Sequence, residues 1–356
     1  MNIWTPTKVG NLAIKNRLAM APMTRSRANP DGTPTPLAAE YYSQRAGLGL
    51  LVAEGTQPSA EGQGYIFTPG IYTDAHVEGW KQITSAVHAA GSRLFIQLMH
   101  VGRVSHPDNT PGHIRAVAPS AIAPGDQMFT LEGMKPIPEP RAMTLADIAR
   151  TVRDFRNAAR RAVDAGADGV EIHGANGYLI HQFFAPNANV RTDAYGGSIE
   201  NRARFAIEVA KSVAEEIGAE RTGIRLSPGA TLRGLEEGPA GPDLYRTLVG
   251  ELNKLGLAYV HLMHLGNDAL LADIRKRWDQ ALIVNRPGRA LQDVGSDIAV
   301  GRADLESYGR FVLSTPDFTA RLKSGSPMNE PDQPTWYGGG AKGYTDYPTL
   351  AERAAA

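Results

Sequence analysis

The segment GVEIHGANGYLIHQFF, residues 169–184, decides both the fold and the position of the predicted site. Its first four residues form a mostly apolar run that is typical of a buried strand. A polar turn follows at once and contains His173, Asn176 and Tyr178. An imidazole and an amide donate well to a carbonyl oxygen, and a phenol, with an ordinary pKa of about 10, stays protonated near neutral pH. The segment therefore indicates an enzyme that polarises a carbonyl and delivers a proton beside it.

Strand-like runs alternate with helical patterns on both sides of this segment. The strands are predicted near residues 17–21, 50–53, 93–98, 169–172, 222–226, 258–262, 281–284 and 303–307. Helices are predicted near 36–45, 75–90, after a capping box at Thr144 and Asp147, from Ser198 to about 217, and near 243–255 and 268–278. The helix between the last two strands is poorly marked, because Pro287 and several glycines fall there.

This alternation predicts an α/β fold of the (β/α)8, or TIM, barrel type, as a single domain over residues 1–356. Long strand-to-helix loops would cap its C-terminal face. The longest is a Pro-rich excursion at about 101–141, which either covers the site or is a surface insertion. A doubly wound open sheet is the main rival, but no G-x-G-x-x-G motif follows the first strand.

Composition excludes several classes of function. The chain has 37 Lys and Arg against 37 Asp and Glu, so no net charge favours nucleic acid or an anionic membrane as partner. There is no cysteine, which excludes disulfides, thiolate metal sites and cysteine-ligated iron–sulfur clusters. No apolar run has membrane-spanning length, and residues 1–4 lack the features of a signal peptide. We expect a cytoplasmic monomer or homodimer that acts on a small molecule.

Residues at the C-terminal ends of barrel strands face the active-site mouth. They are mostly neutral hydrogen-bonding groups with one well-placed cation, and they contain neither a glycosidase-like carboxylate pair nor a metal-binding His cluster. The late glycines and Arg310 are suited to a phosphate, although the glycines alone could be turn residues. The set is Pro22, Met23, Thr24, Gly55, Gln97, His173, Asn176, Tyr178, Arg225, Gly288, Gly309 and Arg310.

Several long motifs, in the right order, resemble the classical branch of the old yellow enzyme family, with its N-ethylmaleimide and xenobiotic reductases. They are APMTR at 21–25, QLMHVGR at 97–103, the run 173–205, RLSP at 225–228 and YGGGAKGYTDYP at 337–348. Two other branches fit less well. One carries a cysteine-ligated cluster and extra domains, and the other usually has Cys where Thr24 stands.

The resemblance implies an ene-reductase with noncovalent FMN in the barrel mouth. Thr24, Gln97 and Arg225 would contact the flavin ring, assisted by Pro22, Met23 and Gly55, while Gly288, Gly309 and Arg310 would hold its phosphate. His173 and Asn176 would bind the substrate oxygen, and Tyr178 would donate the proton. NADPH would supply the hydride, with NADH as an alternative, and nitro compounds or nitrate esters would be side substrates.

Five positions depart from the family pattern or bear on substrate choice. Met99 replaces a common Trp and Gly55 a common Ala, while Tyr65 and Tyr337 match positions that line the substrate mouth in relatives. Arg286 lies in an unusual turn, where it would either add a contact to the phosphate or be a solvated surface charge, and the second role is the one predicted. His181 is given no role beyond that of a buried structural histidine.

Two other functions remain open at this stage. A barrel lyase or aldolase would use His173 and Tyr178 as an acid–base pair on a phosphorylated substrate, but no strand-end Lys or metal cluster supports it. A non-catalytic flavin carrier would bind FMN without turnover. The combination of His173, Asn176 and Tyr178 argues against the carrier.

Overall fold

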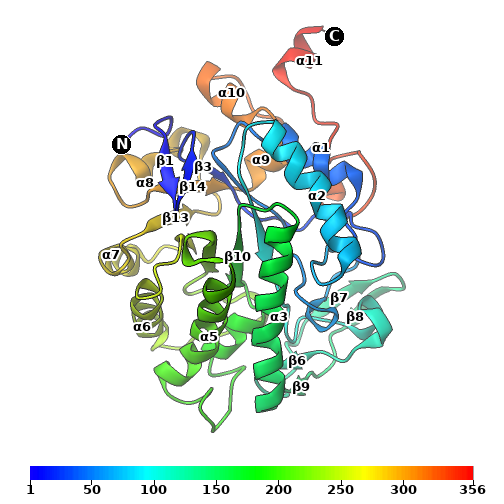
Figure 1. The fold of residues 1–356 in the computed structure, drawn as a ribbon, viewed down its shortest axis with the longest axis vertical. Helices are drawn as coiled ribbons and strands as arrows, with labels where there is room; N and C mark the ends of the chain where they lie inside the picture. Colours follow the sequence, from blue (N-terminus) through cyan, green and yellow to red (C-terminus); the bar gives the residue numbers. More distant parts are fainter. Residues whose placement is uncertain (356) are drawn as a thin grey trace.

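The computed structural model describes residues 1–355 and contains a closed barrel of eight parallel strands (Figure 1). Strand β14 pairs with β3, so the sheet has no free edge. The predicted barrel is confirmed, and the alternative of an open sheet is wrong. In order around the barrel the strands are β3 (Leu18–Met20), β4 (Leu50–Val52), β5 (Leu94–Leu98), β10 (Gly169–Gly174), β11 (Thr222–Leu226), β12 (Tyr259–Met263), β13 (Ala281–Asn285) and β14 (Leu305–Tyr308).

Helices return the chain from one strand to the next and cover the outside of the barrel (Figure 1). The weak helical signal before the last strand corresponds to α8, which has only four residues, Ser296–Ala299. A short helix, α4 (Leu179–Phe184), follows the polar turn after β10. The other helices are α1 (Pro36–Gln44), α2 (Asp74–Ala89), α3 (Leu145–Asp164), α5 (Ile199–Ile217), α6 (Gly241–Asn253), α7 (Asp268–Arg277), α9 (Arg310–Ser314), α10 (Phe318–Ser324) and α11 (Leu350–Ala355).

The N-terminal end of the barrel is filled by apolar side chains. A hairpin of β1 (Thr7–Val9) and β2 (Leu12–Ile14), absent from the sequence prediction, contributes Val9 and Ile14 to this cluster. Gly223 makes room for the Tyr259 ring, because a Cβ at position 223 would lie 2.3 Å from that ring. With this end closed, only the C-terminal end is left for a ligand.

The excursion at 101–141 is more ordered than the Pro-rich composition suggested. It contains a parallel pair, β6 (Val117–Ala118) with β9 (Arg141–Ala142), and an antiparallel pair, β7 (Gln127–Thr130) with β8 (Gly133–Pro136). Met128 and Ile137 from this region pack in one cluster with Met99 and Tyr178. The excursion therefore forms part of the wall around Tyr178 and is not merely a surface insertion.

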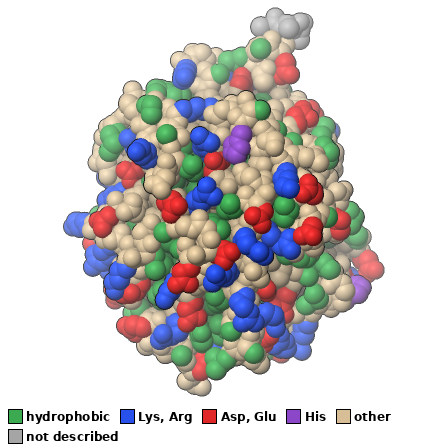
Figure 2. Space-filling view, in the orientation of Figure 1, with side chains coloured by type: hydrophobic (Ala, Val, Ile, Leu, Met, Phe, Trp, Pro, Cys, Tyr) green, Lys and Arg blue, Asp and Glu red, His purple; other side chains and the backbone are tan. Residues whose placement is uncertain are grey.

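The molecular surface agrees with the balanced composition. Figure 2 shows positive and negative side chains interspersed over the visible face, with no extended region of one sign. Within residues 1–355, no helix combines the length and apolar character that crossing a bilayer requires.

The capping box at the start of α3 gives a test of the fold. Thr144 Oγ1 accepts from the Asp147 N–H at 3.1 Å, and Asp147 Oδ2 accepts from the Thr144 N–H at 2.9 Å. Because Thr144→Ala removes one half of this exchange, we expect it to lower the free energy of unfolding by about 1 kcal/mol. The measurement is the thermal unfolding midpoint.

Thr349→Ala is the matched control. Thr349 and Glu352 make the same reciprocal contacts at the start of α11, a helix of six residues that projects from the body in Figure 1. Its loss should leave the global midpoint unchanged. Equal shifts in the two variants would contradict the proposed contribution of the α3 cap.

Candidate active site

Three neighbouring strands bring polar side chains to the C-terminal end of the barrel, which is called the mouth below. In the parallel register His173 of β10 lies opposite Arg225 of β11, and Arg225 lies opposite His261 of β12. The three side chains belong to buried residues, with exposed fractions of 4%, 5% and 0%. Strand pairing alone therefore positions an imidazole beside a guanidinium at the mouth.

The turn after β10 is held in an uncommon conformation. Asn176 has φ +57° and Gly177 φ +84°, and asparagine is among the few residues that tolerate this left-handed region. The Asn176 N–H donates to Ser227 Oγ at 2.8 Å. The Gly177 N–H donates to His181 Nδ1 at 3.0 Å, and its carbonyl accepts from Gln182 Nε2 at 2.8 Å. Side chains of α4 thus fix the turn that carries Asn176.

His181 is a structural residue, as predicted. Its ring is fully buried, and Nε2 lies 2.7 Å from Glu237 Oε1, which also accepts from the Tyr245 hydroxyl. Both ring nitrogens are therefore engaged, one by the turn and the other by a carboxylate. The imidazole therefore stabilises the turn that carries Asn176 and has no ring nitrogen left for a ligand.

The site itself contains buried polar atoms without partners. Among the residues that the structure describes, His173 Nδ1, Asn176 Oδ1 and Arg225 Nε have no hydrogen bond. Arg225 makes no ion pair within this part of the chain, and its one side-chain hydrogen bond, to Asn285 Oδ1, is long at 3.4 Å. Buried polar groups are normally paired, so three such atoms at one barrel mouth indicate a bound polar ligand.

Burial also sets the charge states here. Burial, and secondarily the nearby Arg225 cation, lowers the pKa of His173 well below its ordinary value. Burial lowers the pKa of Arg225 as well, but from an ordinary value so high that the guanidinium remains charged. The mouth therefore presents a neutral imidazole next to a fixed cation.

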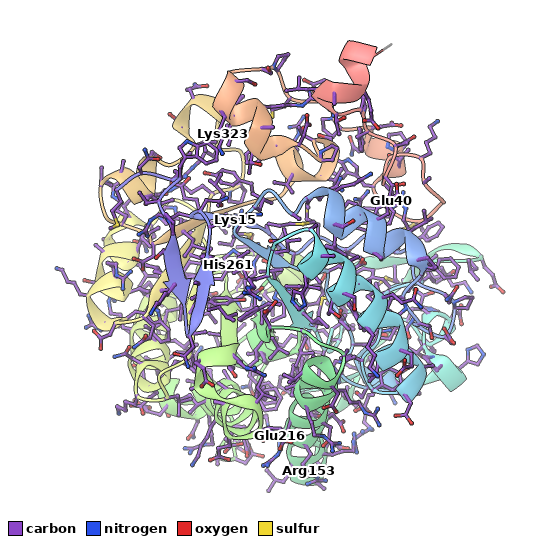
Figure 3. The ribbon with its side chains drawn as sticks, turned by 45° about the horizontal axis from the view of Figure 1, so that its top comes forward. Lys15, Glu40, Arg153, Glu216, His261 and Lys323 are labelled. Carbon is purple, nitrogen blue, oxygen red and sulfur yellow. The ribbon has the colours of Figure 1, made fainter. Side chains whose placement is uncertain are left out.

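Below the mouth, Glu171 organises a buried polar layer. Its carboxylate accepts from Gln97 Nε2 at 2.8 Å and lies 2.8 Å from His261 Nδ1, while His261 Nε2 contacts Ser307 Oγ at 2.7 Å. Although burial raises the pKa of Glu171, these donors and Arg225 together hold it below its ordinary value. Figure 3 labels His261 toward the middle of the molecule, whereas Arg153 and Glu216 lie at its outer edge. Glu171 is thus engaged by Gln97 and His261, and Arg225 is not its ion-pair partner.

The remaining predicted cofactor residues follow β3, β4, β13 and β14. Pro22, Met23 and Thr24 are half-buried, and the Thr24 hydroxyl has no hydrogen bond within the described residues. Gly309 lies against Met23, since a Cβ at 309 would be 3.2 Å from the Met23 sulfur. Arg310 is exposed, and its guanidinium has no hydrogen-bond or ion-pair partner among residues 1–355. Thr24, which follows β3, and Arg310, which follows β14, are therefore available to a ligand, and these two strands pair to close the barrel.

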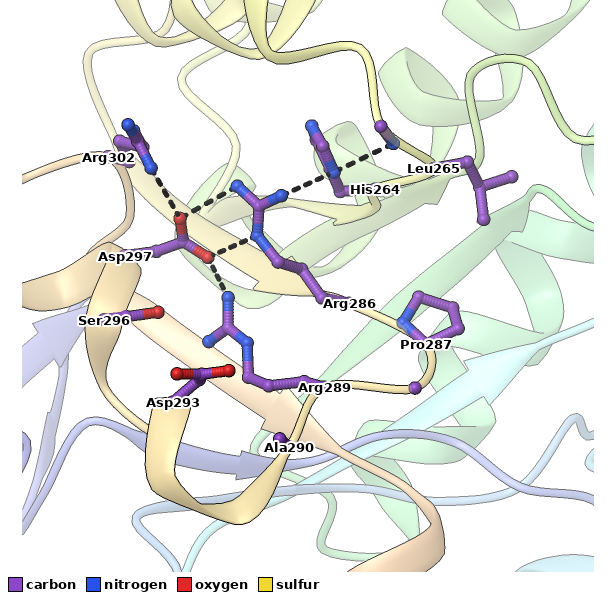
Figure 4. A pocket seen from close by; sticks show the side chains of 12 residues that line it. His264, Leu265, Arg286, Pro287, Arg289, Ala290, Asp293, Ser296, Asp297 and Arg302 are labelled. Carbon is purple, nitrogen blue, oxygen red and sulfur yellow. Dashed lines mark hydrogen bonds and ion pairs between the residues drawn. The ribbon is translucent and has the colours of Figure 1, made fainter.

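The turn after β13 corrects one prediction. Arg286 was expected to be a solvated surface charge, but its side chain is only 23% exposed and binds both oxygens of Asp297, at 2.7 and 2.9 Å (Figure 4). Arg289 pairs with the same carboxylate and with Glu306. Asp297 and Glu306 are buried, so the guanidiniums that pair with them are drawn in from the solvent. Gly288 lies exposed between the two arginines, at φ +77°, and lines a hollow of about 710 Å³.

The predicted substrate-lining residues are placed differently from one another. Tyr65 is half-buried, and its hydroxyl lies 3.0 Å from that of Tyr178, whose ring centroid is 5.2 Å from that of His173. Met99 belongs to the same apolar cluster as Tyr178. Tyr337 is 65% exposed in the C-terminal region. The structure therefore groups Tyr65 and Met99 with Tyr178, but not Tyr337.

The two departures at Gly55 and Met99 are physically linked. A Cβ at position 55 would lie 2.5 Å from both Sδ and Cε of Met99. The thioether therefore occupies the space that an alanine methyl would need. The sequence marked each position separately and gave no sign that they touch.

Sequence reasoning missed two further contributors, His261 and Arg233. His261 lies in a strand that was predicted, and the alternation of inward-facing residues could have placed it in the barrel interior. Arg233 lies in an irregular loop, and its Nη2 donates to the Tyr65 hydroxyl at 2.9 Å. No periodicity in the sequence points to that contact.

Comparison with known proteins identifies the class. The family model for the NADH:flavin oxidoreductase / NADH oxidase family matches residues 2–329. Chanoclavine-I aldehyde reductase of Penicillium roqueforti is 41% identical over 367 residues, covering 98% of this chain and 97% of that protein. 12-Oxophytodienoate reductase 2 of Arabidopsis thaliana is 41% identical over 363 residues, covering 98% and 96%.

Solved structures agree with this result. Morphinone reductase in complex with tetrahydroNAD superposes with a TM-score of 0.94 at 42% identity, covering 98% of each chain. The old yellow enzyme homologue from Zymomonas mobilis gives a TM-score of 0.94 at 38% identity, covering 98% of this chain and 100% of that one. The chain therefore belongs to the NADH:flavin oxidoreductase / NADH oxidase family, that of the old yellow enzymes. It is an NAD(P)H:flavin oxidoreductase of the old yellow enzyme type.

The contact between Gly55 and Met99 predicts a coupled pair of substitutions. We expect Gly55→Ala alone to lower the free energy of unfolding by about 1 kcal/mol, because the new methyl group must displace the flexible end of Met99 and lies 3.2 Å from its Cβ. In a Met99→Ala background the same change should cost much less. A double-mutant cycle on thermal or denaturant unfolding measures the difference.

Gly250→Ala is the control. A Cβ at Gly250, within α6, would meet no other atom within 4 Å, so this change should not destabilise the protein. Equal costs of Gly55→Ala in the wild-type and Met99→Ala backgrounds would show that the two residues are independent.

Proposed function

We propose that the protein is an FMN-dependent NADPH oxidoreductase that reduces the activated C=C bond of α,β-unsaturated carbonyls, maleimides and nitroalkenes. The observation that carries this proposal is the set of unpaired buried atoms on His173, Asn176 and Arg225. They combine a fixed cation with neutral hydrogen-bonding groups, next to the Tyr178 phenol. Nitro compounds and nitrate esters are side substrates under the same proposal, because a nitro oxygen can replace a carbonyl oxygen.

The donor set fits FMN. Arg225 offers an unsatisfied guanidinium to the edge of the flavin ring where negative charge collects on reduction. Gln97 donates its amide to Glu171, which leaves its Oε1 free to accept from the pyrimidine N–H. Thr24 has a hydroxyl without a partner among the described residues, and Pro22, Met23 and Gly55 would complete the contact with the ring.

The phosphate of FMN would be held after β13 and β14. Arg310 supplies a guanidinium without a protein partner in the described chain, and Gly288 and Gly309 would supply backbone N–H groups. Arg286 is excluded from this role, because Asp297 and Asp268 already engage it. Residues 1–356 would form one FMN-binding barrel.

His173 and Asn176 would hold the activating oxygen of the substrate. A neutral imidazole donates through one ring N–H, and the Asn176 amide donates through its NH₂ group. Their hydrogen bonds draw electron density from the alkene and prepare the β-carbon for hydride. FMN, when bound, supplies that hydride from its N5 position. Tyr178 then transfers its phenolic proton to the α-carbon.

Tyr65, Met99 and Tyr337 would shape the space for the rest of the substrate. Tyr65 and Met99 adjoin Tyr178 in one cluster, which supports their part in this proposal. Tyr337 would contribute only if a ligand bound near the exposed C-terminal region. A flexible thioether at 99 suits substrates of varied shape.

NADPH is the proposed hydride source, with NADH as the alternative. The similar morphinone reductase has been solved with a reduced nicotinamide analogue, which supports a nicotinamide donor here. Donor and alkene would use the same mouth in turn, as a ping-pong scheme requires. Cytoplasmic localisation and a monomeric or homodimeric state stay predictions from the sequence.

An anaerobic absorption spectrum tests the proposal directly. The purified protein should show flavin bands that bleach when NADPH is added and return when cyclohexenone is added. Colourless protein that takes up no FMN would instead favour a barrel lyase, and flavin that never bleaches would favour a carrier.

Tyr178→Phe tests the proton donor. We expect FMN content and reduction by NADPH to be retained, while alkene reduction slows by about 100-fold or more, since positioned general acids contribute about 10²–10⁴-fold. Stopped-flow absorption of the two half-reactions measures both effects. Tyr195→Phe, which removes a hydroxyl that donates to Glu208 at 2.9 Å, is the control and should leave both rates unchanged. Undiminished enone turnover in Tyr178→Phe would remove Tyr178 from the mechanism.

A further inference from the structure

Two phenols and a guanidinium form a chain that leads to Tyr178. Arg233 Nη2 donates to the Tyr65 hydroxyl at 2.9 Å, and that hydroxyl lies 3.0 Å from the Tyr178 hydroxyl. The two tyrosine rings meet edge to face, with centroids 6.4 Å apart. The three residues come from separate loops, after β4, β10 and β11. Only the folded barrel brings them together.

The donor-only character of arginine gives this chain a direction. A guanidinium has no acceptor, so the Tyr65 oxygen accepts from Arg233 and keeps its own hydrogen for another partner. Within residues 1–355, the Tyr178 oxygen is the only other recorded partner of that hydroxyl. Burial, and next the Tyr178 phenol, raises the pKa of Tyr65 well above its ordinary value, so Tyr65 keeps this hydrogen.

Arg233 is held in place by more than its contact with Tyr65. Its backbone adopts φ +59°, an uncommon left-handed conformation for arginine. Arg103 Nη2 donates to the Arg233 carbonyl at 3.1 Å, and Arg233 Nη1 pairs with Asp126 at 3.3 Å. Arg233 also packs against the turn that carries Asn176, since a Cβ at Gly177 would be 2.8 Å from Arg233 Cβ. A strained and multiply anchored arginine indicates a positioned group.

We propose that Arg233 is a positioning residue that acts through Tyr65 to orient the Tyr178 hydroxyl and to stabilise the phenolate left after proton transfer. Arg233 donates to Tyr65, and Tyr65 donates to Tyr178. The Tyr178 hydrogen is then directed away from both and toward the mouth, on the side of His173. Asp126 ties this arrangement to the 101–141 excursion that covers the site.

The arrangement assists the proton-transfer step in a defined way. The Tyr178 O–H bond breaks and its electron pair stays on oxygen. The new C–H bond at the substrate α-carbon uses the electron pair of the C=C π bond, which is displaced to that carbon when hydride adds to the β-carbon. The Tyr65 hydroxyl then donates to an anionic oxygen, and a hydrogen bond to a charged group is stronger than one to a neutral group. The cation of Arg233 adds to this effect, and a proton from solvent later restores Tyr178. The inference rests on the proposed alkene reduction.

Arg233→Met is the principal test. We expect reoxidation of the NADPH-reduced holoenzyme by cyclohexenone to slow about 10- to 100-fold, because a hydrogen bond to a charged group is lost from the proton-transfer step. Reoxidation by ferricyanide, which protonates no carbon, should not change. Equal slowing with both acceptors, or no slowing with cyclohexenone, would overturn the proposal. Wild-type enzyme that fails to reduce cyclohexenone would refute the proposed function instead.

A double-mutant cycle tests whether the effect passes through Tyr65. Tyr65→Phe should slow the cyclohexenone reaction by a similar factor, and Arg233→Met added to Tyr65→Phe should slow it little further. Fully multiplicative effects would contradict action through Tyr65. Arg233→Lys, which keeps a donor-only cation, should recover part of the lost rate, and Asp126→Asn, which keeps the guanidinium, should lose much less than Arg233→Met.

A readout without turnover separates orientation from general damage. In holoenzyme labelled with fluorotyrosine, the ¹⁹F resonance of Tyr178 is assigned by its loss in Tyr178→Phe. Its chemical shift should change in Arg233→Met and stay near the wild-type value in Asp126→Asn. An unchanged Tyr178 resonance in Arg233→Met would show that the guanidinium has no influence on that phenol.

Discussion

The buried Glu171 carboxylate is the interaction on which the rest of the site depends. It joins Gln97 of β5 to His261 of β12, and His261 extends the connection to Ser307 of β14. A buried carboxylate without such partners would be very costly, so these strands must keep their register for the fold to persist. Gln97 and His261 already engage Glu171, and burial lowers the pKa of His261, which favours its neutral form. Arg225 is therefore left near Glu171 without an ion-pair partner among residues 1–355. The same interaction that stabilises the barrel interior thus leaves a cation available at the mouth.

The sequence predicted the barrel because its signals are local and repeated. Apolar runs mark each strand, and the caps at Thr144 and Ser198 mark helices that the structure contains. The hairpin β1–β2 was missed because only the last residue of each strand is buried, so neither strand forms a continuous buried apolar run. The barrel strands β3 and β4 are equally short, but all their residues are buried and apolar. The small sheets within 101–141 were missed for a similar reason, since prolines and glycines interrupt their short strands. The hairpin and the small sheets are stabilised by packing against the rest of the protein more than by the strand propensity of their own residues.

The candidate site was predictable where it follows strand ends and unpredictable where it depends on loops. His173 and Arg225 could be placed at the mouth because strand pairing fixes their positions. Arg286 could not be judged from sequence, because its burial depends on Asp297, which lies on a separate helix and is only 1% exposed. Arg233 could not be found either, since its role comes from a contact with Tyr65 that is 168 residues away in the chain.

The linked pair of Gly55 and Met99 suggests how this barrel accommodates change near its mouth. A large rigid ring at 99 would need space on one side of the site, whereas the thioether bends over the glycine and fills the volume that a methyl group would take. Met99 also packs in one cluster with Tyr178, so its conformation bears on the space in front of the proton donor. Under the proposal above, Arg233 would set the direction of the Tyr178 hydroxyl through Tyr65. Tyr65 belongs to both arrangements, because it packs in the cluster with Met99 and its hydroxyl lies 3.0 Å from that of Tyr178. Under the proposed function, a change at Tyr65 would therefore alter substrate shape and proton delivery together, whereas a change at Arg233 would alter mainly proton delivery.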